Sequence, residues 1–170
     1  IIGAGTNRMN KYTVGKATQG LSNYILKNNP EGKAMGVALA YDSRNMSSEF
    51  AEMSALVLNA NGIKAYIFDE LRPTPELSFA VRHLGCTAGI VVTASHNPPE
   101  YNGYKVYWAD GAQVVAPKDE GIISEVNSIT DFSAIKMMDK AEAVKNGLFN
   151  VVGKEIDDAF VENIKKQAVR

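Results

Sequence analysis

Apolar residues recur along the chain with two alternating periods, one typical of helices and one typical of buried strands. The first helical pattern covers residues 14–25, and its apolar face consists of Val14, Ala17, Leu21, Tyr24 and Ile25. We expect the segment from Asn29 to Gly32 to end this helix, because asparagine, proline and glycine are helix-stop residues. The apolar run 35–41 then predicts a buried strand that leads directly to Asp42.

A second helix is predicted to start at Ser47 or Ser48, because a serine hydroxyl accepts hydrogen bonds from the free N–H groups of a first helical turn. The helix is expected to stop at Gly62. Residues 65–68 then form a second short apolar run, which predicts another strand.

A third helix is predicted between Thr74 and Gly85, with the Thr74 hydroxyl as its cap and Pro75 at its first position. The run 88–93 is the most apolar of the chain and predicts a third strand. Strands that alternate with helices of this length indicate a mainly parallel sheet covered on both faces.

One further strand, 104–108, follows Asn102 and Gly103, which are typical of a turn. The connection from the previous strand is about ten residues long, too short for a crossover helix, so this strand is expected to be antiparallel. A helix over 119–129 comes next, with four apolar residues expected to face inward: Ile122, Ile123, Val126 and Ile129. The fold class predicted is therefore α/β, a three-layer α/β/α sandwich with a four-stranded mixed sheet whose last strand is antiparallel.

The pattern changes in the last part of the chain. Residues 1–142 are predicted to form one domain, whereas 143–170 are predicted to be a linker and the start of a following domain. Ile156, Phe160 and Ile164 leave only a narrow apolar stripe on the helix expected there. The chain begins at Ile1 without a methionine, which we interpret as a piece of a longer protein.

Composition excludes several classes of protein. The net charge is -1, without a long basic block, so no nucleic-acid partner is predicted. No apolar run reaches the roughly 18 residues of a membrane span, so no membrane partner is predicted either. The single cysteine, Cys86, excludes an internal disulfide, and the first residues do not resemble a secretory leader, so secretion is not expected. The predicted location is cytoplasmic.

The segment after the third strand carries the candidate chemistry. Ser95, His96 and Asn97 follow the strand directly, and Pro98 and Pro99 stiffen the loop behind them. Ligands of open α/β sheets bind beyond the carboxyl ends of the strands, so a hydroxyl at this point is well placed for catalysis.

An acyl-transfer role for Ser95 is disfavoured by the sequence. The surrounding residues do not match the Gly-x-Ser-x-Gly elbow of hydrolases. Adjacent residues of an extended chain point to opposite faces, so we expect a hydrogen-bonded pair of Ser95 and His96 to be geometrically awkward.

Phosphoryl transfer fits the loop better. A phosphate on Ser95 would carry about -1.5 to -2 charges at pH 7. His96, Asn97 and Lys105 offer hydrogen-bond donors for such a group. The pattern alone leaves open that this loop is only a polar connection at the end of a sheet.

A family resemblance favours the phosphoryl-transfer interpretation. The stretch TASHNP (93–98), followed by YNGYK (101–105), resembles the phosphoserine signature of the α-D-phosphohexomutases of the phosphoglucomutase/phosphomannomutase type. The stretches GTNRMN (5–10), AYDSR (40–44) and RPTP (72–75) are similar to further segments of the first domain of that family. The resemblance extends over nearly all of residues 1–142.

The resemblance implies an enzyme that interconverts hexose 1-phosphate and hexose 6-phosphate through a hexose 1,6-bisphosphate intermediate. Ser95 would match the serine that donates the phosphate and takes it back. Lys105 would match a general acid/base lysine and His96 a catalytic histidine beside the phosphoserine. Asn97, Arg8 and Arg44 would contribute to substrate binding.

The resemblance also implies components that this chain lacks. The aspartate-rich loop that holds Mg²⁺ in the family appears nowhere in the sequence, and Asp157 and Asp158 do not replace it. Ser95 would supply one Mg²⁺ ligand through its phosphate, and one ligand does not make a site. We therefore expect the remaining domains of the same polypeptide to complete the enzyme, and this chain alone to be inactive.

Two alternatives remain. One is a phosphopentomutase or a sugar-bisphosphate synthase, because the residues that select the sugar are not in this chain. The other is a non-catalytic binding or structural module with the same fold.

Overall fold

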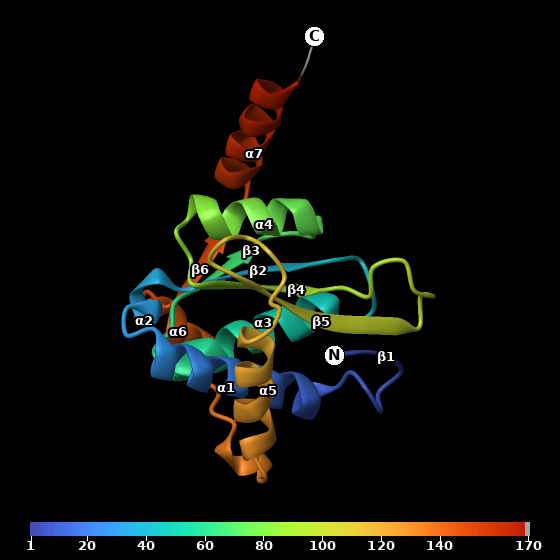
Figure 1. Ribbon diagram of the computed structural model, residues 1–170, viewed down its shortest axis with the longest axis vertical. Coiled ribbons are helices and arrows are strands. Elements are labelled where there is room, and N and C mark those ends of the chain that lie inside the picture. The colour runs from blue at the N-terminus through green and yellow to red at the C-terminus, as the bar shows by residue number, and fades with distance from the viewer. Residues whose placement is uncertain (169–170) are drawn as a thin grey trace.

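Three parallel strands form the middle of the sheet in the computed structural model, which describes residues 1–168 (Figure 1). They are β2 (Val37–Tyr41), β3 (Ala65–Phe68) and β4 (Ala88–Val92). β2 lies between the other two and pairs in parallel with both. The apolar runs of the sequence therefore correctly predicted these strands and their direction.

Helices cover both faces of the sheet (Figure 1). α1 (Lys11–Asn28), α3 (Ser47–Ala60) and α5 (Lys118–Ser128) lie on one face, and α4 (Thr74–His83) lies on the other. Successive side chains of a strand point to opposite faces of the sheet, so β2 contributes alternate residues to the core on each face. Val37 and Leu39 pack with α1 and α3, whereas Ala38 and Ala40 pack with α4.

The sheet has six strands in the order β1-β5-β4-β2-β3-β6, so the prediction of four strands was too low. β5 (Tyr101–Trp108) is antiparallel to β4, as predicted. It begins before the expected turn, so Asn102 and Gly103 are paired strand residues rather than a hairpin. The strands that the sequence did not reveal are β1 (Ile2–Ala4), antiparallel to β5, and β6 (Phe149–Val152), parallel to β3.

Three short helices connect larger elements: α2 (Gly32–Met35), η1 (Phe132–Ala134) and α6 (Lys140–Lys145).

The segment that follows residue 142 contributes to this sheet. β6 extends the sheet, and α7 (Lys154–Gln167) then leads away from it beyond α4 (Figure 1). Ile156 of α7 is fully buried against α4, whereas Ile164 is half exposed. The domain boundary at 142/143 stays a prediction, and residues 169–170 lie outside the described part of the chain.

Two helix starts differ from the prediction. Neither Ser47 nor Ser48 caps α3, because the residue before the helix is Met46, which has a left-handed backbone with φ 65°. The residue before α4 is Pro73, and the Thr74 hydroxyl makes no cap bond. Among the apolar residues of α5, Ile122 is buried as predicted, whereas Ile123 is exposed.

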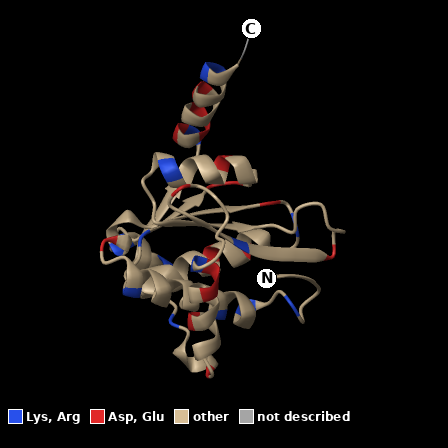
Figure 2. Cartoon of the chain, viewed as in Figure 1, with Lys and Arg blue, Asp and Glu red and all other residues tan. Residues whose placement is uncertain are grey.

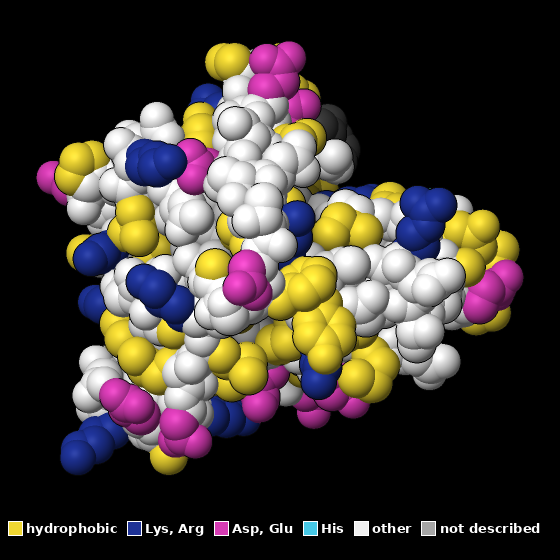
Figure 3. All heavy atoms as spheres, turned by 90° about the horizontal axis from the view of Figure 1, so that it is seen from below, with side chains coloured by type: hydrophobic (Ala, Val, Ile, Leu, Met, Phe, Trp, Pro, Cys, Tyr) yellow, Lys and Arg dark blue, Asp and Glu magenta, His cyan; other side chains and the backbone are white. Residues whose placement is uncertain are grey.

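The distribution of charged side chains on the surface agrees with the net charge of -1. Charged residues lie mainly on helices and connecting loops and alternate in sign (Figure 2). On the face opposite α4 and α7, hydrophobic side chains form patches between Lys, Asp and Glu (Figure 3). None of the helices within residues 1–168 combines the length and apolarity that a membrane crossing requires.

The close packing of α1 against α5 gives the first prediction. A Cβ atom at Gly20 would lie 2.7 Å from the backbone nitrogen of Val126, and backbone cannot move aside cheaply. We expect Gly20→Ala to lower the free energy of unfolding by about 1–3 kcal/mol, measured by urea denaturation.

Gly15→Ala in the same helix is the matched control. Its added Cβ would lie 3.2 Å from a terminal methyl group of Ile135, which can shift, and alanine favours the helix. Equal effects of the two substitutions would show that the contact between α1 and α5 is not the tight one described.

Candidate active site

A cleft of about 820 Å³ opens at the carboxyl ends of the parallel strands. Three connecting loops form it, namely those that follow β2, β3 and β4, together with one residue of β5. The residues on which the site depends are Asp42, Arg44, Arg72, Ser95, His96, Asn97 and Lys105. The structure therefore brings four of the predicted catalytic and binding residues together, Ser95, His96, Asn97 and Lys105, and places Arg44 beside them.

Ser95 lies in a turn directly beyond β4. Its backbone is left-handed, with φ 57°, and its N–H donates to the Oγ1 atom of Thr93 over 3.0 Å. The side chain of Ser95 is exposed to the cleft, whereas Ala94 beside it is fully buried. The Ser95 hydroxyl therefore lies next to a buried strand end and is exposed to the cleft.

The expectation that a hydrogen-bonded pair of Ser95 and His96 is geometrically awkward was wrong. The Oγ atom of Ser95 lies 3.1 Å from the Nδ1 atom of His96. The expectation assumed an extended chain, and the left-handed backbone of Ser95 turns both side chains to the same side instead. Within residues 1–168, no carboxylate holds the other nitrogen of His96, so the orienting group of a hydrolase triad is missing.

Arg44, which lies shortly after β2, holds the loop that carries Ser95. Its Nη1 atom donates to the carbonyls of Pro98 and Tyr101 over 2.7 and 2.9 Å. Its Nη2 atom donates to the carbonyls of Ser95 and Asn97 over 3.1 and 2.7 Å. The side chain is only 14% exposed.

Asp42 and its neighbours hold Arg44 in place. The carboxylate of Asp42 lies 3.2 Å from the Nε atom of Arg44 and accepts hydrogen bonds from the Arg44 N–H and the Ser47 hydroxyl. The buried amide of Asn102 donates to the same hydroxyl and to the carbonyl of Asn45. The position of Asp42 at a strand end was a usable sequence signal, whereas the sequence indicated Ser47 only as a helix cap and Asn102 only as a turn residue within the family signature.

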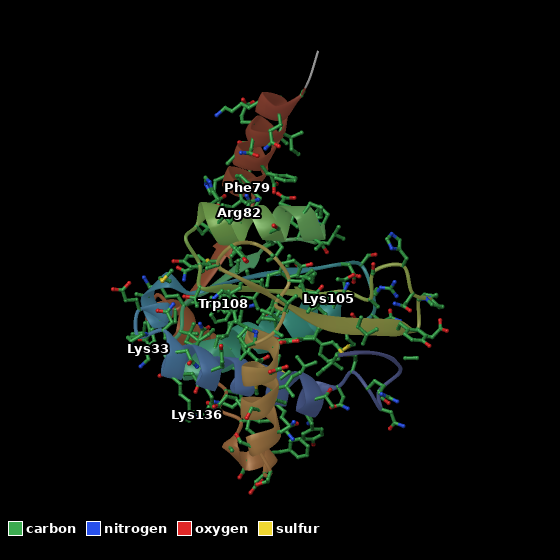
Figure 4. All side chains as sticks on the ribbon, viewed as in Figure 1. Lys33, Phe79, Arg82, Lys105, Trp108 and Lys136 are labelled. Atoms are coloured by element: carbon green, nitrogen blue, oxygen red, sulfur yellow. The ribbon has the colours of Figure 1, made fainter. Side chains whose placement is uncertain are left out.

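Lys105 projects from β5 beside the cleft (Figure 4). It pairs with Val91 of β4, whose side chain packs on the α4 face of the sheet. Paired residues point to the same face, so Lys105 lies on that face and contributes a cation to the cleft.

The two remaining predicted residues differ in position. Asn97 lines the cleft, but its side-chain amide and its N–H both donate to the carbonyl of Ala94, so it stabilises the turn. Arg8 is exposed in the loop after β1 and is not among the residues that line the cleft. A substrate-binding role for either residue stays a prediction.

Arg72 connects the cleft to α7. Its guanidinium binds the carboxylate of Asp157 at two points, over 2.7 and 2.9 Å, and contacts Asp69 over 3.1 Å. Glu76 is 6% exposed and also faces Asp157, and its Oε1 atom has no hydrogen-bond partner within residues 1–168. Burial, followed by the hydrogen bond and charge of Asp157, raises the pKa of Glu76 to about 7.

Residues 1–132 match the model of the phosphoglucomutase/phosphomannomutase family, alpha/beta/alpha domain I. The chain belongs to this family. Phosphoglucomutase of Staphylococcus haemolyticus is 36% identical over 96% of the chain, and human phosphopentomutase is 42% identical over 71% of it. The chain spans only 29% and 21% of the length of these two relatives.

Solved structures support the fold assignment. A protein assigned as a phosphomannomutase of Thermus thermophilus superposes on 99% of the chain with a TM-score of 0.83 at 24% identity. The chain covers 35% of that structure. At this identity the superposition supports the phosphoglucomutase/phosphomannomutase fold and not a particular substrate.

The Mg²⁺ expected for a phosphoglucomutase/phosphomannomutase domain does not fit the residues present. Within residues 1–168, no group of three or more His, Cys, Asp or Glu side chains is arranged to hold a metal ion. The acidic residue of the cleft, Asp42, is already bound to Arg44 and Ser47. Mg²⁺ prefers near-octahedral oxygen coordination, which residues 1–168 do not provide by themselves.

The buried carboxyl of Glu76 gives the second prediction. Its pKa is raised in the folded state, so the folded protein binds the proton more tightly than the unfolded chain between pH 4.5 and about 7. The free energy of unfolding therefore falls as the pH rises through this range. Glu76→Gln removes the titration, and we expect the variant to be more stable than the wild type at pH 8, on the order of 1 kcal/mol.

Denaturation at pH 5 and at pH 8 measures this effect. At pH 5 the wild-type carboxyl is protonated, so the two proteins should differ little. A Glu76→Gln variant that gains no stability over wild type between pH 5 and pH 8 would contradict the raised pKa of Glu76.

Proposed function

We propose that this chain is the phosphoserine-bearing domain of a sugar-phosphate mutase that interconverts hexose 1-phosphate and hexose 6-phosphate. One observation supports this most: in a chain of the phosphoglucomutase/phosphomannomutase family, the Ser95 hydroxyl is exposed at the carboxyl rim of the sheet, on a loop braced by Arg44, and opens into the cleft.

The reaction consists of two phosphoryl transfers. In the first, a hydroxyl oxygen of the sugar phosphate attacks the phosphorus on Ser95, the bond from phosphorus to the new oxygen forms, and the bond from phosphorus to Ser95 Oγ breaks. The hydroxyl proton passes to a base, and the Ser95 oxygen takes up a proton. After the hexose 1,6-bisphosphate turns over, its other phosphoryl group returns to Ser95 by the reverse steps.

The residues around Ser95 have separate roles in this proposal. Lys105 is the general acid/base near the reacting hydroxyl and also attracts the phosphoryl charge. His96, whose Nδ1 atom lies 3.1 Å from Ser95 Oγ, orients the serine hydroxyl through a hydrogen bond when the phosphate is absent. Both roles depend on positioning and charge, which are the main contributions of proteins to phosphoryl transfer.

The rest of the polypeptide supplies what this chain lacks. The chain covers less than a third of its curated relatives, so we propose that further domains provide the sugar-recognition residues and the ligands of Mg²⁺. Relatives are named phosphoglucomutase and phosphopentomutase, so a pentose phosphate is the alternative substrate. A cytoplasmic location stays a prediction.

Phosphorylation of Ser95 is the third prediction. Full-length protein should carry one phosphoryl group on Ser95 in intact-mass and peptide analysis. Ser95→Ala should lose that group and reduce mutase kcat by at least about 10³-fold, because no other residue takes over the nucleophile's role.

Ser48→Ala is the matched control. Ser48 is an exposed serine, and among the described residues its hydroxyl is hydrogen-bonded only to the carboxylate of Glu49. It should retain both the phosphoryl group and the activity. Full mutase activity of Ser95→Ala would contradict the proposed function.

The isolated 170-residue chain provides the fourth prediction. It should fold, as measured by circular dichroism, but should not interconvert sugar phosphates, because the cleft contains no metal site among the described residues. Turnover by the isolated chain, freed of full-length enzyme, would contradict the need for further domains.

A further inference from the structure

The loop from Ser95 to Tyr101 has an unusual arrangement of its backbone. The carbonyl oxygens of Ser95, Asn97, Pro98 and Tyr101 all converge on the guanidinium of Arg44, at 2.7–3.1 Å. Residues 95–100 are exposed, and of their side chains the Asn97 amide donates within the turn, to the carbonyl of Ala94. Among the described residues, Arg44 is the side chain that makes the most hydrogen bonds to the backbone of this loop, four in all.

The donors of Arg44 are fully occupied. Each terminal nitrogen of a guanidinium carries two N–H groups, and both nitrogens of Arg44 donate to two carbonyls each. The Nε atom faces the carboxylate of Asp42 at 3.2 Å. No N–H group remains for a substrate phosphate, so the predicted substrate-binding role of Arg44 does not fit this geometry.

The contacts of Arg44 have a consequence for Ser95. A non-glycine residue in the left-handed region is strained, and such a conformation persists only where surrounding contacts fix it. The carbonyl of Ser95 is fixed by Arg44 and its N–H by Thr93. These two contacts hold the backbone conformation that turns the hydroxyl toward His96 and the cleft.

The same contact orients the next peptide group. In a trans peptide the carbonyl of Ser95 and the N–H of His96 point in opposite directions. Since the carbonyl points at Arg44, the N–H of His96 points away from it. Within residues 1–168, this N–H donates to no carbonyl or side chain.

We propose that Arg44 is a positioning residue for phosphoryl transfer at Ser95: by gathering four loop carbonyls it fixes the Ser95 hydroxyl in the cleft and leaves the N–H of His96 to bind the phosphoryl group on that hydroxyl. This inference rests on the proposed function, because it assigns Arg44 to the same site.

Lysine does not replace arginine in this role. The forked, planar guanidinium matches acceptors that lie in fixed directions around it, whereas an ammonium group is a compact point charge on a flexible stem. Arg44→Lys preserves the positive charge and the ion pair with Asp42, but it cannot hold carbonyls on both branches of the fork. The substitution therefore distinguishes the role of Arg44 in positioning the loop from the effect of its positive charge.

The experiment compares full-length wild type, Arg44→Lys and Arg44→Ala. We expect Arg44→Lys to lower kcat by about 10²-fold, the loss typical of a small misplacement, while KM for the sugar phosphate changes little. Added guanidinium at low concentration should partly restore kcat of Arg44→Ala and not of Arg44→Lys, whose ammonium group occupies the space. Arg82→Lys is the matched control, because Arg82 is exposed on α4, outside the cleft, and should leave kcat unchanged.

Amide hydrogen exchange provides a readout that does not depend on activity. In Arg44→Lys, amides within 95–102 should exchange faster while those of β4 stay protected. This result can be interpreted even if Ser95 is not phosphorylated. In that case the proposed function is wrong, but faster exchange still shows that Arg44 stabilises the loop.

Two outcomes would overturn the inference. An increase in KM with unchanged kcat would show that Arg44 binds the substrate phosphate. Unchanged kcat together with unchanged exchange in 95–102 would show that the loop does not need Arg44. If Arg44→Ala is misfolded by circular dichroism, the comparison of Arg44→Lys with wild type and Arg82→Lys decides.

Discussion

The hydrogen bonds between the Arg44 guanidinium and the carbonyls of the loop after β4 are the constraint on which the site depends. They connect the end of one parallel strand to the end of its neighbour, because β2 leads to Arg44 and β4 leads to Ser95. The sheet brings these two ends together, since carboxyl ends of parallel strands meet at one edge. Without the guanidinium, this exposed loop would keep its short-range hydrogen bonds to Thr93 and Ala94 and the bond from Gly5 to Glu100, but would lose four bonds to the neighbouring strand end.

Much of the fold could be predicted from the sequence. The three central strands are short apolar runs between amphipathic helices, and this pattern determines both their direction and their burial. β1 and β6 could not be predicted in the same way, because each has only three or four residues and is defined by its pairing with β5 or β3, which lie far away in the sequence. The cap of α3 was missed because Ser47 bonds to Asp42 instead of the helix N-terminus, a tertiary contact that residue propensities do not contain.

The candidate site was predictable in its location and less so in its geometry. The position of Ser95 beyond the most apolar strand, together with the family resemblance, was enough to identify the cleft. The contact between Ser95 and His96 was not, because it depends on the positive φ of Ser95. Arg44 was predicted to bind substrate, since a sequence shows the charge of an arginine but not the acceptors that its N–H groups meet. The raised pKa of Glu76 was missed for the same reason, because it results from burial and from Asp157 on a distant helix.

The central claim is that the Ser95 oxygen gives a phosphoryl group to the sugar and takes it back. Rapid-quench mixing tests it most directly: full-length protein labelled with radioactive phosphate on Ser95 is mixed with excess unlabelled hexose 1-phosphate. We predict that the label leaves Ser95 and appears in hexose bisphosphate within the first turnover. Label that stays on residue 95 while the sugar phosphate is converted would contradict the claim.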